Sequence, residues 1–298
     1  MDISGRKIIG GLLIISIIAI LIAFVVTSLD TVNIGNNIGL INIEGVISSN
    51  ASGSLLTKPR QSFLSQLRAA EQDPSIKALV IRIDSPGGTS GTSQELFQTV
   101  LRIRQKGIPV IVSMGDTAAS GGYYVASAAD YIFANGSTIT GSIGVIMEFT
   151  NLEELYNKIG IKYEIIKSGA YKDAGHSARS LTPAEEKLFA DLIHDVWDQF
   201  VTDVTESRGL EREKVEALAD GRILTGRQAL EAGLIDEIGG LEEALNKAQE
   251  AAGIVGPFRI KSYQEPLSWF ERILSVINNV PNILENLPRS SISIRYQY

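Results

Sequence analysis

The fold of this chain is decided by residues 110–147, which read VIVSMGDTAASGGYYVASAADYIFANGSTITGSIGVIM. The apolar run at 110–114 predicts a buried strand, and the small residues at 123–129 predict a helix. A second short strand is predicted at 131–134, before a turn rich in glycine and serine. Because strands alternate with helices, we expect parallel strands joined by right-handed crossovers, which is an α/β fold.

Ser120 lies between the first of these strands and the helix, and two glycines, Gly121 and Gly122, follow it. A helix N-terminus presents free backbone N–H groups that can stabilise an anion, and glycine lets a substrate carbonyl approach the backbone closely. An acyl-transfer nucleophile needs such a setting, because its tetrahedral intermediate carries an oxyanion. Serine is also a good helix N-cap, so this segment alone leaves both interpretations open.

Similar strand–turn–helix units lie on both sides of this stretch. Residues 78–84 form a short apolar run typical of a buried parallel strand, and the turn SPGG at 85–88 leads into a predicted helix over 93–106. Functional loops of parallel sheets gather at the carboxyl ends of the strands, so this turn and the Ser120 turn should converge. Later, a capping box at 182–185 predicts a long amphipathic helix that runs to about residue 207.

Two histidines, His176 and His194, are the only ones in the chain that could serve Ser120 as a base. His194 falls on the polar side of the predicted long helix, which is typical of a solvated surface residue. His176 lies in a loop and stays open as an alternative. A lysine is the simplest choice, provided that desolvation or cationic neighbours lower its pKa from about 10.4 towards 7 or 8.

Lys172 is the best candidate lysine, because the loop at 168–175 surrounds it with small and apolar residues. This loop follows a predicted strand at 163–167. Asp173 would oppose the assignment, since a nearby carboxylate raises the pKa of a lysine unless it points away. Composition alone favours an ordinary surface lysine.

Composition excludes several classes of function. The 298 residues, 44% of them hydrophobic, allow one domain of about 230 residues with a sizeable core. The net charge of −7 and the lack of a basic stripe argue against binding to nucleic acid. Cysteine is absent, which excludes disulfides, thiol nucleophiles and thiolate metal sites. No cluster has the spacing of metal ligands, so we expect neither a metal nor another cofactor.

Residues 8–29 are apolar and carry no charge, and about 20 such residues span a hydrocarbon core of about 30 Å. We therefore expect an N-terminal transmembrane helix. Arg6 and Lys7 precede it and Asp30 follows it, which predicts a cytoplasmic N-terminus and an extracytoplasmic domain at the cell membrane. A cleaved signal peptide is the alternative, but its apolar region is normally about 7 to 15 residues long.

Four motifs carry a resemblance to a known family: DSPGG at 84–88, ASGGYY at 119–124, TGSIGV at 140–145 and SGAYKDAG at 168–175. In this order, and behind an N-terminal anchor, they resemble the signal peptide peptidase A family of membrane-anchored serine proteases. The resemblance covers residues 38–265. It implies a Clp-protease/crotonase-like fold with a repeated ββα superhelical core. It also implies a serine endopeptidase that hydrolyses signal peptides or other unfolded segments near the membrane.

The resemblance also implies roles for individual residues. Ser120 would be the nucleophile, Lys172 the general base and Ser142 the residue that holds the lysine amine. The oxyanion donors would be the backbone N–H groups of Gly87, Gly88 and Gly121. After the lysine loop, this chain has HSAR at 176–179 where the family often has a proline-containing run, so the local shape of this loop is expected to differ.

The expected domain organisation follows from these segments. It comprises a cytoplasmic stub and anchor (1–30), a linker (31–37), the peptidase domain (38–265) and an amphipathic C-terminal arm (266–298). The resemblance further implies a homo-oligomeric ring in which serine and lysine can come from different subunits, with peptides as the substrates, and the sequence leaves a dyad within one chain open. Two alternatives stay open: a crotonase-like acyl-CoA enzyme, and a non-catalytic scaffold tethered to the membrane.

Overall fold

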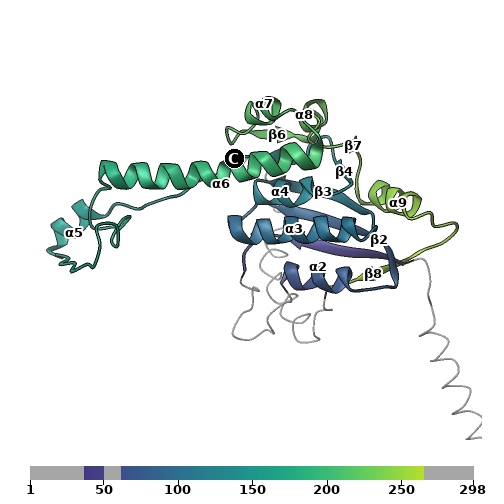
Figure 1. Ribbon diagram of the computed structural model, residues 1–298, viewed down its shortest axis with the longest axis horizontal. Helices are drawn as coiled ribbons and strands as arrows, with labels where there is room; N and C mark the ends of the chain where they lie inside the picture. The colour runs from purple at the N-terminus through teal and green to yellow at the C-terminus, as the bar shows by residue number, and fades with distance from the viewer. Residues whose placement is uncertain (1–36, 50–61, 265–298) are drawn as a thin grey trace, which may run out of the picture.

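The computed structural model describes residues 37–49 and 62–264 (Figure 1). In chain order the elements are β1 (Asn37–Glu44), α2 (Phe63–Glu71), β2 (Ile76–Ser85), α3 (Ser90–Gln105), β3 (Val110–Ala119), α4 (Gly121–Ser127), β4 (Tyr131–Ala134), β5 (Ile139–Gly141), α5 (Glu153–Ile159), α6 (Pro183–Arg208), α7 (Arg212–Glu216), β6 (Ile223–Thr225), α8 (Gly226–Ala232), β7 (Glu237–Ile238), α9 (Leu241–Ala251) and β8 (Arg259–Ser262). The predicted α/β architecture is confirmed.

The eight strands of the described residues join one sheet, in the order β6-β5-β3-β2-β1-β8, with β4 paired to β3 and β7. Every pairing among the described strands is parallel except that of β5 with β6. The predicted parallel core is therefore confirmed. Its parallel register places the ends of β2 and β3 together, because Ser85 pairs with Ala118.

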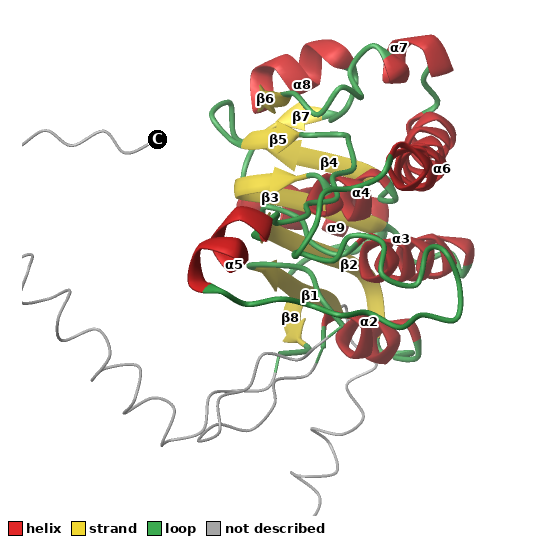
Figure 2. Ribbon diagram, turned by 90° about the vertical axis from the view of Figure 1, so that its left-hand side faces the viewer, coloured by secondary structure: helices red, strands yellow, loops and turns green. Residues whose placement is uncertain are grey.

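Helices cover both faces of the sheet, and the alternation of side chains along β2 explains how. Leu79, Ile81 and Ile83 face the larger core, which contains residues of α2, α3, α4 and α6. Ala78 and Val80 face a smaller core that is closed by α9. Figure 2 shows α2, α3 and α6 side by side along the first of these faces. Both faces of β2 are thus buried, which is why its sequence is a continuous apolar run.

The long helix α6 begins at the predicted capping box of Thr182 with Glu185 and ends at Gly209 in the left-handed conformation. Its buried apolar residues, however, all lie in its last third, beginning at Phe200. Leu188 and Leu192, which belong to the apolar face of this predicted amphipathic helix, are 38% and 47% exposed. The N-terminal half of α6 therefore leaves the body of the protein.

Residues 146–195, which we call the arm, contain α5, the loop after it and the N-terminal half of α6. Figure 1 shows the arm projecting away from the sheet. Glu185 is the only buried residue along this described segment. The strand predicted at 163–167 does not form, because the arm lies away from the strands that could pair with it.

Residues 8–29 and 266–298, for which we predicted a membrane helix and an amphipathic arm, lie outside the described residues. Within the described part of the chain, no helix combines the length and the apolar character needed to cross a membrane.

The edge strand β8 is held to the body by Asp73, whose carboxylate lies 2.5 Å from Lys261 Nζ and accepts a hydrogen bond of 2.6 Å from the Tyr263 hydroxyl. Burial by itself raises the pKa of Asp73, but the hydrogen bonds from Lys261, Ser75 and Tyr263 outweigh it and hold this pKa well below its usual range. A pKa lowered by folding stabilises the native state above the unfolded-state pKa of about 4, and this contribution is lost as the pH falls through the folded pKa.

We expect Asp73→Asn to lower the free energy of unfolding by about 1–2 kcal/mol at pH 7, because four hydrogen bonds to a charged acceptor are weakened. The difference from the wild type should shrink as the pH falls below about 4. Urea unfolding of both proteins at pH 7 and pH 3 measures this difference in the free energy of unfolding. The control is Asp191→Asn, which breaks an exposed ion pair with Lys187 and should change stability by less than about 0.5 kcal/mol. An equal effect of both substitutions at pH 7 would contradict this role of Asp73.

Candidate active site

Ser120 lies between β3 and α4. Its backbone has φ 52° and ψ −121°, a conformation that residues with a side chain rarely adopt. Its backbone is fixed on both sides, because Ser120 N donates to Gly141 O and Tyr124 N donates to Ser120 O. Its side chain makes no capping hydrogen bond to α4. An ordinary N-cap serine has an extended backbone, and its hydroxyl oxygen accepts a hydrogen bond from a backbone N–H of the first helical turn. Helix capping therefore does not explain why a serine occupies position 120.

Backbone strain points to the same residues as the sequence motifs. Within the described residues, Ser120 and Ser142 are the only non-glycine residues with positive φ, and φ of Ser142 is 49°. Such conformations cost about 1–3 kcal/mol each and cluster at functional sites. The predicted nucleophile and the predicted lysine-holding serine are therefore the two non-glycine residues with this strained backbone conformation among the described residues.

The turn between β2 and α3 packs directly against the Ser120 turn. A Cβ atom added to Gly87 would lie 2.8 Å from Gly121 N and 2.9 Å from Ser120 Cβ, and one added to Gly121 would lie 3.3 Å from Gly88 N. The predicted convergence of the two glycine-rich turns is thus present in the structure. Since any side chain at Gly87 would collide with Ser120, glycine is required there.

The three predicted oxyanion donors differ in their hydrogen bonding. Gly87 N–H donates to Ser85 Oγ at 3.1 Å. Gly88 N–H has no acceptor among the described residues, and Gly121 N–H belongs to the first turn of α4, which a helix leaves unpaired. Gly88 and Gly121 therefore carry the free donors beside Ser120, and Gly87 shapes the turn.

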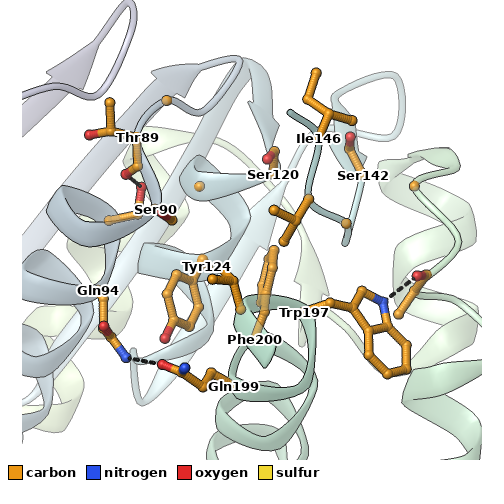
Figure 3. A pocket seen from close by; sticks show the side chains of 18 of the residues that line it. Thr89, Ser90, Gln94, Ser120, Tyr124, Ser142, Ile146, Trp197, Gln199 and Phe200 are labelled. Atoms are coloured by element: carbon orange, nitrogen blue, oxygen red, sulfur yellow. Dashed lines mark hydrogen bonds between the residues drawn. The ribbon is translucent and has the colours of Figure 1, made fainter. Parts of the chain in front are cut away.

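Ser120, Ser142, Gly88 and Gly121 all line one cavity of about 800 Å³. Figure 3 shows Ser120 between the Thr89–Ser90 turn and Ser142. The apolar wall of the cavity comprises Val145, Ile146, Val196, Trp197, Phe200 and Ala219. This volume is in the range of cavities that hold organic ligands or short peptide segments.

Aromatic residues make the floor of this cavity rigid. The Tyr124 ring stacks on Phe97 at 4.8 Å and contacts Phe200 at 4.6 Å, while its hydroxyl donates to Asp203. Burial first, and Asp203 second, raise the pKa of Tyr124 well above its ordinary value, so this tyrosine stays neutral. We did not predict these residues as part of a site, because an apolar stripe on a helix indicates core packing just as well.

Trp197 forms the opposite part of the wall, and its Nε1–H donates to Ala219 O at 2.7 Å (Figure 3). His194, predicted to be a solvated surface histidine, is exposed but stacks on Trp197 with ring centroids 5.4 Å apart. His194 is not among the residues that line the cavity.

Comparison with known proteins identifies the family. Residues 102–255 match the model of Peptidase family S49. The chain is 40% identical over 238 residues to the putative protease slr0021 of Synechocystis sp., which covers 79% of this chain and 85% of that protein. The chain belongs to peptidase family S49. As an S49 member it is a serine protease, and this excludes the acyl-CoA enzyme and the scaffold as alternatives.

Other S49 relatives are longer than this chain. It is 36% identical over 213 residues to the putative signal peptide peptidase SppA of Enterococcus faecium, and this match covers 70% of this chain and 62% of that protein.

Among solved structures, the chain is similar to a mutant of the 1510-N membrane-bound stomatin-specific protease. The identity is 16% and the TM-score is 0.48, over 76% of this chain and 97% of that one.

In this S49 chain the predicted base, Lys172, does not lie at the cavity of the same chain. No lysine or histidine is among the described residues that line the cavity. The segment between α5 and α6, which contains Lys172 and His176, lies at the far end of the arm in Figure 1. His176 accepts a hydrogen bond at Nδ1 from Ala178 N and contacts the Tyr163 ring edge-on. The fold thus brings together Ser120, Ser142, Gly88 and Gly121, and leaves both candidate bases apart.

Proposed function

We propose that this protein is a membrane-anchored serine endopeptidase that hydrolyses signal peptides or other unfolded segments near the membrane. The observation that carries the proposal is the strained Ser120, which lies beside two free N–H groups at a cavity of about 800 Å³. The cavity is open and has an apolar wall, which suits an extended apolar segment better than a folded protein. The similarity to the putative signal peptide peptidase of Enterococcus faecium supports this substrate class.

In the proposed mechanism, Ser120 Oγ attacks the carbonyl carbon of the scissile bond while the neutral Lys172 amine takes the hydroxyl proton. The N–H groups of Gly88 and Gly121 bind the oxyanion of the tetrahedral intermediate. When the C–N bond breaks, Lys172 returns the proton to the leaving amine, and water then hydrolyses the acyl-enzyme by the same steps. Ser142 Oγ, which lies at the same cavity, holds the lysine amine by a hydrogen bond.

We further propose that Lys172 enters the cavity of a neighbouring subunit in a homo-oligomeric ring. Lys172 is exposed on the arm, and apolar side chains of the same part of the arm are exposed as well, among them Ile166 at 102%, Ile159 at 58% and Tyr163 at 50%. Exposed apolar surface of this extent is typical of protein contacts. A neighbour that covers this surface would also remove water from around the lysine amine, which favours its neutral form.

For localisation, we propose a single-pass protein of the cell membrane with a cytoplasmic N-terminus and an extracytoplasmic catalytic domain. The proposal rests on the uncharged segment 8–29 and on Arg6 and Lys7 before it. Protease added to intact cells should reach the catalytic domain. Cleavage only in inverted vesicles would reverse this topology.

The choice of base predicts the pH dependence of the reaction. Because a lysine must lose its proton before it can act, peptide hydrolysis by the full-length protein should rise through neutral pH towards an alkaline plateau. In His176→Ala, the rate at each pH should stay within about twofold of the wild-type rate, because His176 Nδ1 already accepts a hydrogen bond from Ala178 N. Rates measured with a quenched fluorogenic apolar peptide from pH 5 to pH 10 test both statements. A maximum near pH 5, or an inactive His176→Ala protein, would favour histidine as the base.

A further inference from the structure

The loop that carries Lys172 is tied to α6 by Arg179. The guanidinium of Arg179 binds both oxygens of Glu185, at 2.6 and 2.8 Å, and lies 3.1 Å from Asp173 Oδ1. It also donates to the backbone carbonyl oxygens of Asp173, at 3.3 Å, and Ser180, at 3.0 Å. Arginine suits this place because its planar fork binds Glu185 through two N–H groups and still reaches Asp173, a bidentate geometry that a lysine ammonium does not offer.

Asp173 is the direct neighbour of Lys172, and its carboxylate is fully engaged elsewhere. Besides Arg179, it binds Lys167 Nζ at 2.5 Å, and its side chain is only 9% exposed. The hydrogen bonds from Arg179, and then from Lys167, hold the pKa of Asp173 well below its usual range. In contrast, the Lys172 ammonium has no hydrogen-bond or ion-pair partner among the described residues, and Lys172 is exposed.

The charges of this cluster cancel. Two cations, Lys167 and Arg179, face two anions, Asp173 and Glu185. In the same region of the arm, the His176 ring contacts the phenol ring of Tyr163, which in turn contacts that of Tyr156 from α5. Asp173 is the next residue after Lys172, so removal of Arg179 would leave a net negative charge one residue away from the lysine, and a nearby negative charge opposes loss of its proton.

We infer that Arg179 is a positioning residue for the reaction, because it holds the Asp173 carboxylate against Glu185 and away from the neighbouring Lys172 amine. The inference rests on the proposed function, in which Lys172 is the base. It also gives a role to the HSAR run at 176–179, whose last residue is this arginine. In the sequence, the negative charge of Asp173 argued against Lys172 as the base. In the structure, Arg179 of the same loop compensates that charge.

The test compares pH–rate profiles of full-length variants with the same quenched apolar peptide. In Arg179→Met, the rising limb of kcat/KM should move to higher pH by about 1 pH unit, so the rate falls about tenfold at neutral pH and recovers at the plateau. In Asp173→Asn, the limb should move to lower pH. In the double variant, which restores a neutral cluster, it should return to the wild-type position. Arg212→Met is the matched control, because Arg212 also bridges two carboxylates, Asp198 and Glu216, and should leave the limb in place.

The inference is overturned if the pH at which kcat/KM rises does not change with the net charge of the cluster. An unchanged profile in Arg179→Met overturns it, as does a loss that is equal at every pH and is not rescued by Asp173→Asn. If Arg179→Met does not fold, Asp173→Asn alone still decides, because a limb that does not move to lower pH in this variant overturns the inference. The proposed function fails separately, if Lys172→Ala keeps its activity.

Discussion

Ser120→Ala protein is expected to lose peptide hydrolysis by about 10⁴-fold or more, while its unfolding midpoint stays within a few degrees of the wild type. The loss is large because the hydroxyl is the atom that forms the acyl-enzyme, and the free N–H groups of Gly88 and Gly121 cannot replace it. Stability is kept because the Ser120 side chain makes no capping hydrogen bond to α4. Ser65→Ala on the surface of α2 is the control and should be fully active.

Ser120→Gly sharpens this prediction, because the backbone at position 120 has a positive φ of 52°. Glycine adopts this conformation without strain, although it also gains entropy in the unfolded chain. The two effects should leave Ser120→Gly about 1 kcal/mol more stable than the wild type, and equally inactive as Ser120→Ala. Activity and chemical unfolding measured on the same samples would show it. A destabilised Ser120→Gly protein would mean that the strain at this position is not relieved by glycine.

The parts of the fold that were predicted from the sequence are those set by contiguous residues. The β3–Ser120–α4 junction is one such part, since an apolar run, a serine and two glycines dictate it locally. The convergence of Gly87 with Ser120 was predictable as well, because carboxyl ends of parallel strands meet at one edge. The distinction between Gly87 and Gly88 was not, since it depends on the hydrogen bond from Gly87 N–H to Ser85 Oγ.

The arm shows the limit of such predictions. Periodicity indicates that α6 has an apolar face, but it does not indicate what covers that face. In the structure the body covers Phe200 and Val204, and the described residues leave Leu188 and Leu192 exposed. A pattern at 163–167 likewise indicates a strand only where a partner strand lies within reach. Both differences fall on the arm, the segment for which we propose contacts with another subunit.

The arm leads to the second large effect, which is the recovery of activity from two inactive proteins. Lys172→Ala alone should be as inactive as Ser120→Ala, because it removes the base. If the lysine of one chain serves the serine of its neighbour, an assembly that contains both variants has some sites with an intact Ser120 and an intact Lys172. At equal mixing in a ring, about one quarter of the sites should be complete.

The experiment dissociates the two purified variants, mixes them and reassembles them, with a different affinity tag on each. Assemblies that carry both tags should recover about a quarter of the wild-type activity, while each variant reassembled alone should recover none. Mixed Ser120→Ala with Ser120→Ala/Lys172→Ala protein is the control, since no site there has a serine. A dyad completed within one chain predicts no recovery in any mixture. Mixed assemblies that form and stay inactive would therefore contradict the shared site, and would require the arm of each chain to fold back onto its own cavity.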